Sequence, residues 1–469
     1  MNWIRPWLGL ALASVGLTLQ TAQALPPEVT VFPGGSLSRP RLAWSLNRTN
    51  WGAIVETRDS LSSGAWLPAP GGNWPTTTNN WAAPDGVGTG SQFYRVTAIP
   101  PVGQRGRLIS HALVTSYAPS LLGLLFRGFG IDISTRYPVE FHAVTYETID
   151  PYGAPTLASG AVILPVGKTN ASALVLYDHG TSIKKNDVPS QINIEGFLGT
   201  AFATDGYVAV LPDYLGLGSS PGLHPYLHAA SEASASIDLL RAARQLCASN
   251  MVALSDQLFV SGYSQGGHAA LATVRALEAD ETHEFAVTAA GCGSGPYDLA
   301  GVSATDFLSG RVPPNPYYFL YLFAAFQDVY GLAPSLAALL RPPYSTSLPP
   351  LLDGLHDGDV INAAMPKVPT DILDPAQLAD FKVNPNNPLR LALVDNTLLN
   401  WTPRSPLRLY RCSGDQDVLP SNSQVAYDTF QSRGATQVQW LDPDPGADHE
   451  TCSVPALLSI KAWFDTLRK

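Results

Sequence analysis

The pattern of apolar and polar positions divides the chain into three regions, of which the first is short. Arg5 precedes an apolar stretch over residues 7–19, which is too short to span a bilayer as a membrane anchor would. Small residues at Ala22 and Ala24 match a signal-peptidase cleavage site. The pattern therefore predicts a signal peptide over residues 1–24 and a secreted or periplasmic protein.

The second region, residues 25–104, has no helical periodicity. Short runs of β-branched and aromatic residues alternate with turn residues, which is typical of antiparallel strands. We expect a small all-β sandwich that serves as an accessory module. Its tryptophans would form either the core of so small a module or an aromatic carbohydrate-binding surface, and the need for buried area favours the core. These tryptophans are Trp44, Trp51, Trp66, Trp74 and Trp81.

The third region, residues 105–469, alternates between strand-like and helical periods. Two strand-like runs are followed by regular β-α alternation, which predicts an α/β fold with a doubly wound, mostly parallel sheet. Between about residues 297 and 406 the alternation gives way to aromatic, proline-interrupted helical sequence. Because this segment is too long for a loop and too apolar to be fully solvated, we expect an inserted helical cap.

Length and charge narrow the range of functions. A chain of 469 residues fits two domains better than one. The net charge of −10 argues against nucleic acid as a partner. The sequence contains no zinc, calcium, dinucleotide or P-loop motif, so we expect no metal and no cofactor. We also expect a monomer with no integral membrane segment once the signal peptide is removed.

The stretch GYSQGGHAA, residues 262–270, carries the clearest chemical signal. It follows the apolar run DQLFV and opens onto helix-forming residues, so it lies where a strand becomes a helix. Gly262 and Gly266 leave room for a sharp turn that strains Ser264 and exposes its hydroxyl. Ser264 is therefore the candidate nucleophile, with an ordinary turn serine as the alternative.

A serine nucleophile needs a base and an acid that orients the base. His449 follows the last strand-like run and is the candidate base. The rival His268 lies on the helix that follows Ser264. Its side chain should point along that helix, where it would pack or line a pocket. Asp415 and Asp417 both follow the preceding strand. We expect Asp417, three residues after a glycine and just before a helix start, to face His449.

The developing negative charge on the substrate needs two backbone N–H donors. Gln265 directly follows the nucleophile and is one candidate. Thr181 follows the turn His179-Gly180 in the stretch YDHGT and is the other. A simple strand-ending turn is the alternative for this second site.

These motifs, together with PDYLGLG, GDQD and GADH, resemble the secretory lipase branch of the α/β-hydrolase superfamily over about residues 139–469. The chain order Ser, Asp, His is the α/β-hydrolase order. The resemblance implies cleavage of a small-molecule, lipid or polymer ester through an acyl-enzyme. It implies a triad and oxyanion donors at these positions: Ser264, Asp417, His449, Thr181 and Gln265. The N-terminal region resembles the fibronectin-type modules of exported bacterial enzymes.

Two other functions stay open. A serine peptidase of the prolyl-oligopeptidase type shares the positions of nucleophile, acid and base, but usually carries a propeller larger than this N-terminal module. A non-catalytic binding protein on a hydrolase fold would need neither a triad nor oxyanion donors.

The cap sequence bears on the substrate. The run YYFLYLFAAF contains Phe319 and Phe323, whose rings would either form an apolar inner face that buries an acyl chain or only pack the cap onto the sheet.

Export makes disulfides possible. Cys412 ends the strand that leads to the acid loop, and Cys452 follows His449 by three residues. Because both should lie at the carboxyl edge of the sheet, we expect a Cys412–Cys452 disulfide. Cys247 and Cys292 should lie at opposite edges, and we expect them to be free thiols.

Overall fold

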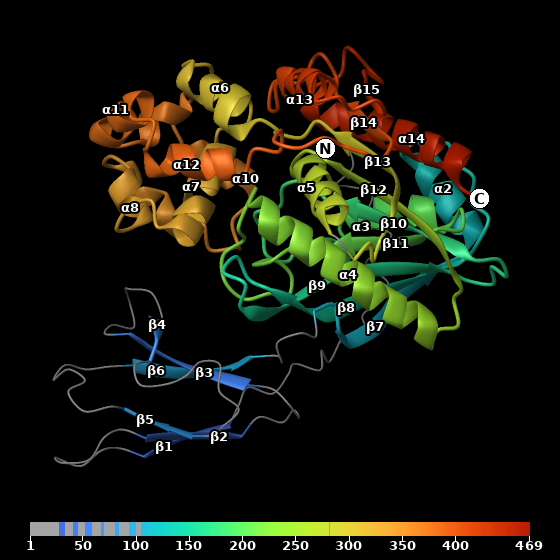
Figure 1. Cartoon of the computed structure of the whole chain (residues 1–469), viewed down its shortest axis with the longest axis horizontal. Coiled ribbons are helices and arrows are strands. Elements are labelled where there is room, and N and C mark those ends of the chain that lie inside the picture. The colour runs from blue at the N-terminus through green and yellow to red at the C-terminus, as the bar shows by residue number, and fades with distance from the viewer. Residues whose placement is uncertain are drawn as a thin grey trace. The chain divides into compact units, whose positions relative to one another are not determined.

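The computed structural model divides the chain into two compact units, Asn2–Arg105 and Gly106–Lys469 (Figure 1). In the second unit it describes all residues except Glu281. In the first unit it describes Arg105 and the segments 28–32, 41–45, 52–58, 67–69, 80–83 and 93–99. The expected signal peptide, residues 1–24, lies outside the described residues.

The described segments of the first unit form two three-stranded antiparallel sheets. The first sheet has the order β1 (Glu28–Phe32), β2 (Arg41–Ser45), β5 (Asn80–Ala82), and the second β4 (Leu67–Pro68), β3 (Gly52–Arg58), β6 (Phe93–Ile99). Trp44 and Trp81 from one sheet share a core cluster with Val55 from the other. These two tryptophans therefore fill the core, whereas Trp51, Trp66 and Trp74 lie outside the described residues.

A nine-stranded sheet organises the second unit and confirms the predicted α/β fold (Figure 1). Its order is β15-β14-β13-β12-β10-β11-β9-β8-β7, in which the six strands from β15 to β11 are parallel and the other three antiparallel. The strands are β7 (Leu108–Tyr117), β8 (Val139–Ile149), β9 (Pro155–Pro165), β10 (Ser172–Asp178), β11 (Val208–Pro212), β12 (Leu254–Tyr263), β13 (Val287–Gly293), β14 (Leu407–Tyr410) and β15 (Val438–Leu441).

Helices cover both faces of this sheet because its central strands are apolar on both sides. On β10, Leu176 belongs to one core cluster and its neighbour Val175 to the other. The first cluster packs under α4 (Ala229–Ser249), α5 (Gln265–Ala279) and α13 (Ser421–Ser432), and the second under α2 (Pro119–Gly128), α3 (Ile194–Ala203) and α14 (His449–Leu467). No helix in the described part of the chain has the length and apolar character that a membrane crossing requires.

The predicted cap lies between β13 and β14, and Figure 1 shows its helices gathered beside the sheet. Its main elements are α6 (Ala304–Leu308), α7 (Tyr317–Tyr330), α8 (Leu336–Leu339), α9 (Tyr344–Ser347), α10 (Gly358–Ala364), α11 (Pro375–Val383) and α12 (Pro388–Asp395), with a π-helical turn, η2 (Leu299–Ser303), before them. The cap has its own apolar core, which also takes in Ile183 and Tyr226 from loops of the sheet domain. The cap is thus seated on the loops that follow β10 and β11.

Candidate active site

Ser264 occupies a strained turn between β12 and α5. Its backbone angles are φ 59° and ψ −123°, a conformation that costs about 1–3 kcal/mol for a residue with a side chain. A Cβ at Gly262 would overlap the carbonyl oxygen of Gly266, and a Cβ at Gly266 would overlap that of Asp178. A side chain at either position would therefore clash with the backbone, so the turn requires both glycines. The predicted sharp turn from strand to helix at Ser264 is confirmed.

A continuous chain of hydrogen bonds starts at the Ser264 hydroxyl. Its Oγ lies 2.7 Å from Nε2 of His449, and Nδ1 of His449 lies 2.6 Å from Oδ2 of Asp415. All three side chains are buried, and the Tyr263 hydroxyl donates to the His449 carbonyl at 2.7 Å. Because an ionised carboxylate only accepts, Nδ1 of His449 carries the proton and Nε2 is free to accept from Ser264.

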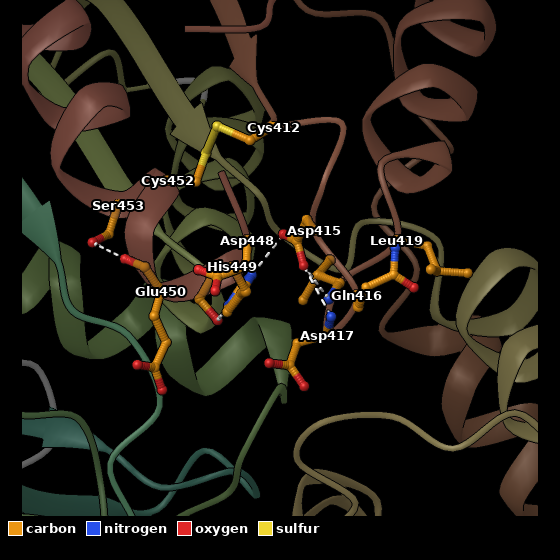
Figure 2. Close-up of polar contacts among 12 residues, drawn as sticks. Cys412, Asp415, Gln416, Asp417, Leu419, Asp448, His449, Glu450, Cys452 and Ser453 are labelled. Atoms are coloured by element: carbon orange, nitrogen blue, oxygen red, sulfur yellow. Dashed lines mark hydrogen bonds and ion pairs between the residues drawn. A yellow bond between two sulfur atoms is a disulfide. The ribbon is translucent and has the colours of Figure 1, made fainter. Parts of the chain in front are cut away.

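Asp417 does not face His449, so the sequence-based choice between the two aspartates is wrong on geometry. The Asp417 carboxylate accepts from the backbone N–H and from Nδ2 of Asn315, at 3.0 and 2.9 Å. Oδ1 of Asp415 accepts the N–H groups of Asp417 and Val418 at 3.0 and 2.9 Å, and this turn directs Oδ2 to His449. Figure 2 shows the Asp415 carboxylate joined to His449, with the Asp417 carboxylate pointing away.

The charges around His449 favour its protonated form. Burial lowers the pKa of His449, but the hydrogen bond and charge of Asp415, with a smaller contribution from Asp417, raise the pKa above its ordinary value of 6.5. Burial also raises the pKa of Asp417, although His449 and Asn315 act in the opposite direction. A site of this kind stabilises an imidazolium that forms during a reaction.

The two expected oxyanion residues belong to segments that adjoin Ser264. Gln265 is the first residue of α5, so its backbone N–H has no carbonyl partner within the helix. In the loop after β10, a Cβ placed on Gly180 would lie 3.9 Å from Cβ of Ser264. Thr181 follows, and its hydroxyl lies 3.0 Å from that of Tyr226. The fold thus brings both segments to the nucleophile.

A disulfide between Cys412 and Cys452 confirms the predicted pairing (Figure 2). Its Cα–Cα distance is 5.9 Å, and it joins the loop that carries Asp415 to the first turn of α14. Cys247 and Cys292 are buried and take part in no disulfide of the described structure. Across the described part of the chain, no three His, Cys, Asp or Glu side chains gather as a metal site would require.

A cavity of about 70 Å³ lies between the cap and the loop that follows Asp415. Its wall includes Tyr226, which contacts Thr181, and Asp417, two residues after Asp415. Phe319 of α7 also lines it, whereas Phe323 is buried in the core of the cap. Phe319 also packs against the ring of Phe307, and Phe323 borders a smaller cavity inside the cap. Both phenylalanines therefore contribute to the core of the cap, and of the two only Phe319 borders the cavity beside Asp417.

Several solved structures share this architecture. The sequence profile of the secretory lipase family matches residues 184–306. The rice cell wall degrading esterase LipA of Xanthomonas oryzae is 31% identical, with a TM-score of 0.70 over 78% of this chain and 100% of LipA. A candidate hydrolase from Legionella pneumophila is 28% identical, with a TM-score of 0.72 over 77% of this chain and 98% of that chain.

Lipase A of Candida antarctica, in its closed state, is more distant. It is 16% identical, with a TM-score of 0.58 over 78% of this chain and 83% of the lipase, so the likeness concerns the fold alone. No curated protein matches the chain.

Proposed function

The chain belongs to the secretory lipase family of α/β-hydrolases and is a carboxylic ester hydrolase, and from this premise we propose that it acts as an exported serine esterase. The observation that carries the proposal is the hydrogen-bonded chain from Ser264 through His449 to Asp415. A nucleophile on a strained elbow, a base within 2.7 Å and a buried carboxylate behind the base are the parts that acyl transfer requires.

Acylation begins when Oγ of Ser264 attacks the ester carbonyl carbon while Nε2 of His449 takes the hydroxyl proton. The carbonyl oxygen becomes an oxyanion, to which the backbone N–H groups of Gln265 and Thr181 donate. The imidazolium then gives its proton to the departing alkoxide oxygen, the alcohol leaves, and an acyl-enzyme remains. His449 next takes a proton from a water molecule that attacks the acyl carbon. The imidazolium then returns that proton to Oγ of Ser264 as the bond to the acyl carbon breaks and the acid leaves.

Asp415 takes the role that the sequence reasoning gave to Asp417. Its buried carboxylate fixes the His449 tautomer and stabilises the imidazolium through a 2.6 Å contact. Asp417 instead connects the acid loop to Asn315 at the base of the cap. We therefore assign Ser264, Asp415 and His449 as the catalytic triad.

The cavity under the cap supports an acyl-binding role for the wall that contains Phe319. Burying each methylene of an acyl chain there would contribute about 0.8 kcal/mol. Since the Xanthomonas oryzae relative is a cell wall degrading esterase, substrates to test include feruloyl and acetylated-glycan esters as well as triglycerides. The family, the disulfide and the expected signal peptide support export.

The decisive experiment compares the wild-type enzyme with Ser264→Ala on a p-nitrophenyl ester. We expect the variant to lose all but a trace of hydrolysis and an organophosphonate to label Ser264 alone. Retained hydrolysis, or a label on another residue, would refute the proposed mechanism. Covalent labelling without any ester turnover would instead support a binding protein on this fold.

A further inference from the structure

A buried polar network surrounds the side chain of Gln265, the residue that follows Ser264. Nε2 of the Gln265 side chain contacts Oε1 of Glu232 at 2.9 Å and Nε2 of His224 at 2.7 Å. Oε2 of Glu232 lies 2.7 Å from Nδ1 of His268, and Nε2 of His268 lies 2.9 Å from the carbonyl oxygen of Asn396. Each of these residues is buried, and the triad uses none of the side chains.

The partners fix where the protons lie. A carbonyl oxygen only accepts, so Nε2 of His268 donates to Asn396, and Nδ1 of His268 shares a hydrogen bond with Oε2 of Glu232. Nδ1 of His224 faces the Leu215 carbonyl at 2.7 Å and therefore donates. Burial lowers the pKa of His224 to about 4, so its Nε2 carries a lone pair.

The Gln265 amide therefore has one orientation. Its two N–H groups donate to His224 and Glu232, whereas a flipped amide would set its oxygen against the carboxylate oxygen of Glu232. Oε1 of Gln265 is buried without a hydrogen-bond partner in the described part of the chain. An unpaired buried oxygen costs about 1–3 kcal/mol. The two hydrogen bonds donated by the amide nitrogen of Gln265 therefore set the orientation of the side chain despite this cost.

We propose that Glu232 and His268 are positioning residues for ester hydrolysis, which hold the Gln265 side chain so that its backbone N–H points at the oxyanion. This inference rests on the proposed function. Gln265 follows the nucleophile directly and begins α5, so contacts that fix its side chain also restrain the residue that carries the N–H. His268 acts through Glu232, whose second oxygen it holds.

Matched substitutions separate this role from packing. Glu232→Met removes the acceptor but keeps the length of the side chain. Glu232→Gln keeps every hydrogen bond without the carboxylate charge, because the new amide can accept from Gln265 and donate to a neutral His268. Gln265→Met breaks the same contact from the other end. Asp238→Asn is the control, since Asp238 is a buried carboxylate on the same helix that bonds Thr148 at 2.7 Å.

The readouts are kcat and KM for p-nitrophenyl butyrate, and Ki for a trifluoromethyl ketone that forms an oxyanion on the nucleophile. Complete loss of one oxyanion donor lowers kcat by about 10²–10³-fold, so we expect a misplaced donor in Glu232→Met to lower kcat by roughly 10- to 100-fold. KM should change little, and Ki should rise by the same factor as kcat falls. Glu232→Gln should recover most of the loss, and Asp238→Asn should keep the wild-type kcat.

The inference is overturned if folded Glu232→Met keeps the wild-type kcat, or if kcat falls while Ki for the ketone stays unchanged. It is also overturned if Glu232→Gln is as impaired as Glu232→Met. Should Glu232→Met fail to fold, Gln265→Met decides by the same two readouts. An active Ser264→Ala variant would refute the proposed function itself, whereas an inactive one beside an unaffected Glu232→Met refutes only this inference.

Discussion

Replacing Asp415 by asparagine should nearly abolish hydrolysis, whereas the same change at Asp417 should leave the chemical step intact. In the native loop, Oδ1 of Asp415 accepts two backbone N–H groups, at 3.0 and 2.9 Å. These donors require an acceptor, so an asparagine at 415 would keep its oxygen there. Its amide nitrogen would then face Nδ1 of His449, where Oδ2 lies at 2.6 Å.

The size of the effect follows from that reversal. Two donors cannot face each other, so His449 would move its proton to Nε2, which could then no longer accept from Ser264. In serine proteases the corresponding change to the wrong tautomer lowers kcat by about 10⁴-fold, which corresponds to about 5 kcal/mol in the activation free energy. Asp417→Asn loses only one of its two hydrogen bonds to Asn315, so kcat should stay within about threefold of wild type.

The assay is the pH profile of kcat for p-nitrophenyl butyrate, with circular dichroism to establish that both variants fold. Asp415→Asn should lower the plateau of the profile, whereas Asp417→Asn should keep the plateau and shift the acid limb slightly down in pH. The shift follows because the Asp417 charge helps to raise the pKa of His449. A profile in which Asp417→Asn loses its plateau and Asp415→Asn keeps it would refute the assignment.

Three further predictions concern the same domain. The base must be neutral to accept a proton, and the pKa of His449 is raised above 6.5. The kcat/KM of the wild type should therefore fall as the pH drops through that raised pKa. A fall in kcat/KM that begins only below pH 6.5 would contradict the environment described for His449. Replacing Cys412 and Cys452 by serine opens a loop of 40 residues and should lower the free energy of unfolding by about 2–4 kcal/mol, measured by calorimetry; an unchanged melting curve would argue against this. Activity should rise from acetate to butyrate or hexanoate by up to about fourfold per methylene, and Phe319→Asn should flatten the rise; a steady decline in the wild type would indicate a small acyl pocket.

Much of the fold could be predicted because it depends on periodicity and on steric demands that single residues reveal. The change from strand-like runs to β-α alternation predicted the mixed sheet, and the elbow followed from Gly262 and Gly266, where a side chain would overlap the backbone. The disulfide followed from the same reasoning, since Cys412 and Cys452 follow strands whose ends meet at one edge.

Side-chain direction was harder to predict. Asp415 and Asp417 are two residues apart, and only the turn that captures Oδ1 of Asp415 decides which carboxylate reaches the histidine. Glu232 was missed altogether, because it lies 33 positions before Gln265 and no local motif joins the two. The sequence predicts packing or pocket lining for His268, and its contact with Glu232 becomes visible only in the structure.

The attachment of the cap has a consequence for protein engineering. An insert between two strands looks like a module that could be exchanged between related esterases to change their substrates. In this chain, however, Arg311 donates to the carbonyl of Gln416 at 2.7 Å, and Asn315 holds the neighbouring Asp417. A transplanted cap without these two contacts would release the loop that aims Asp415. A chimaera should therefore keep the recipient's residues 306–315 and change only what lies beyond them, so that selectivity can be altered without loosening the catalytic carboxylate.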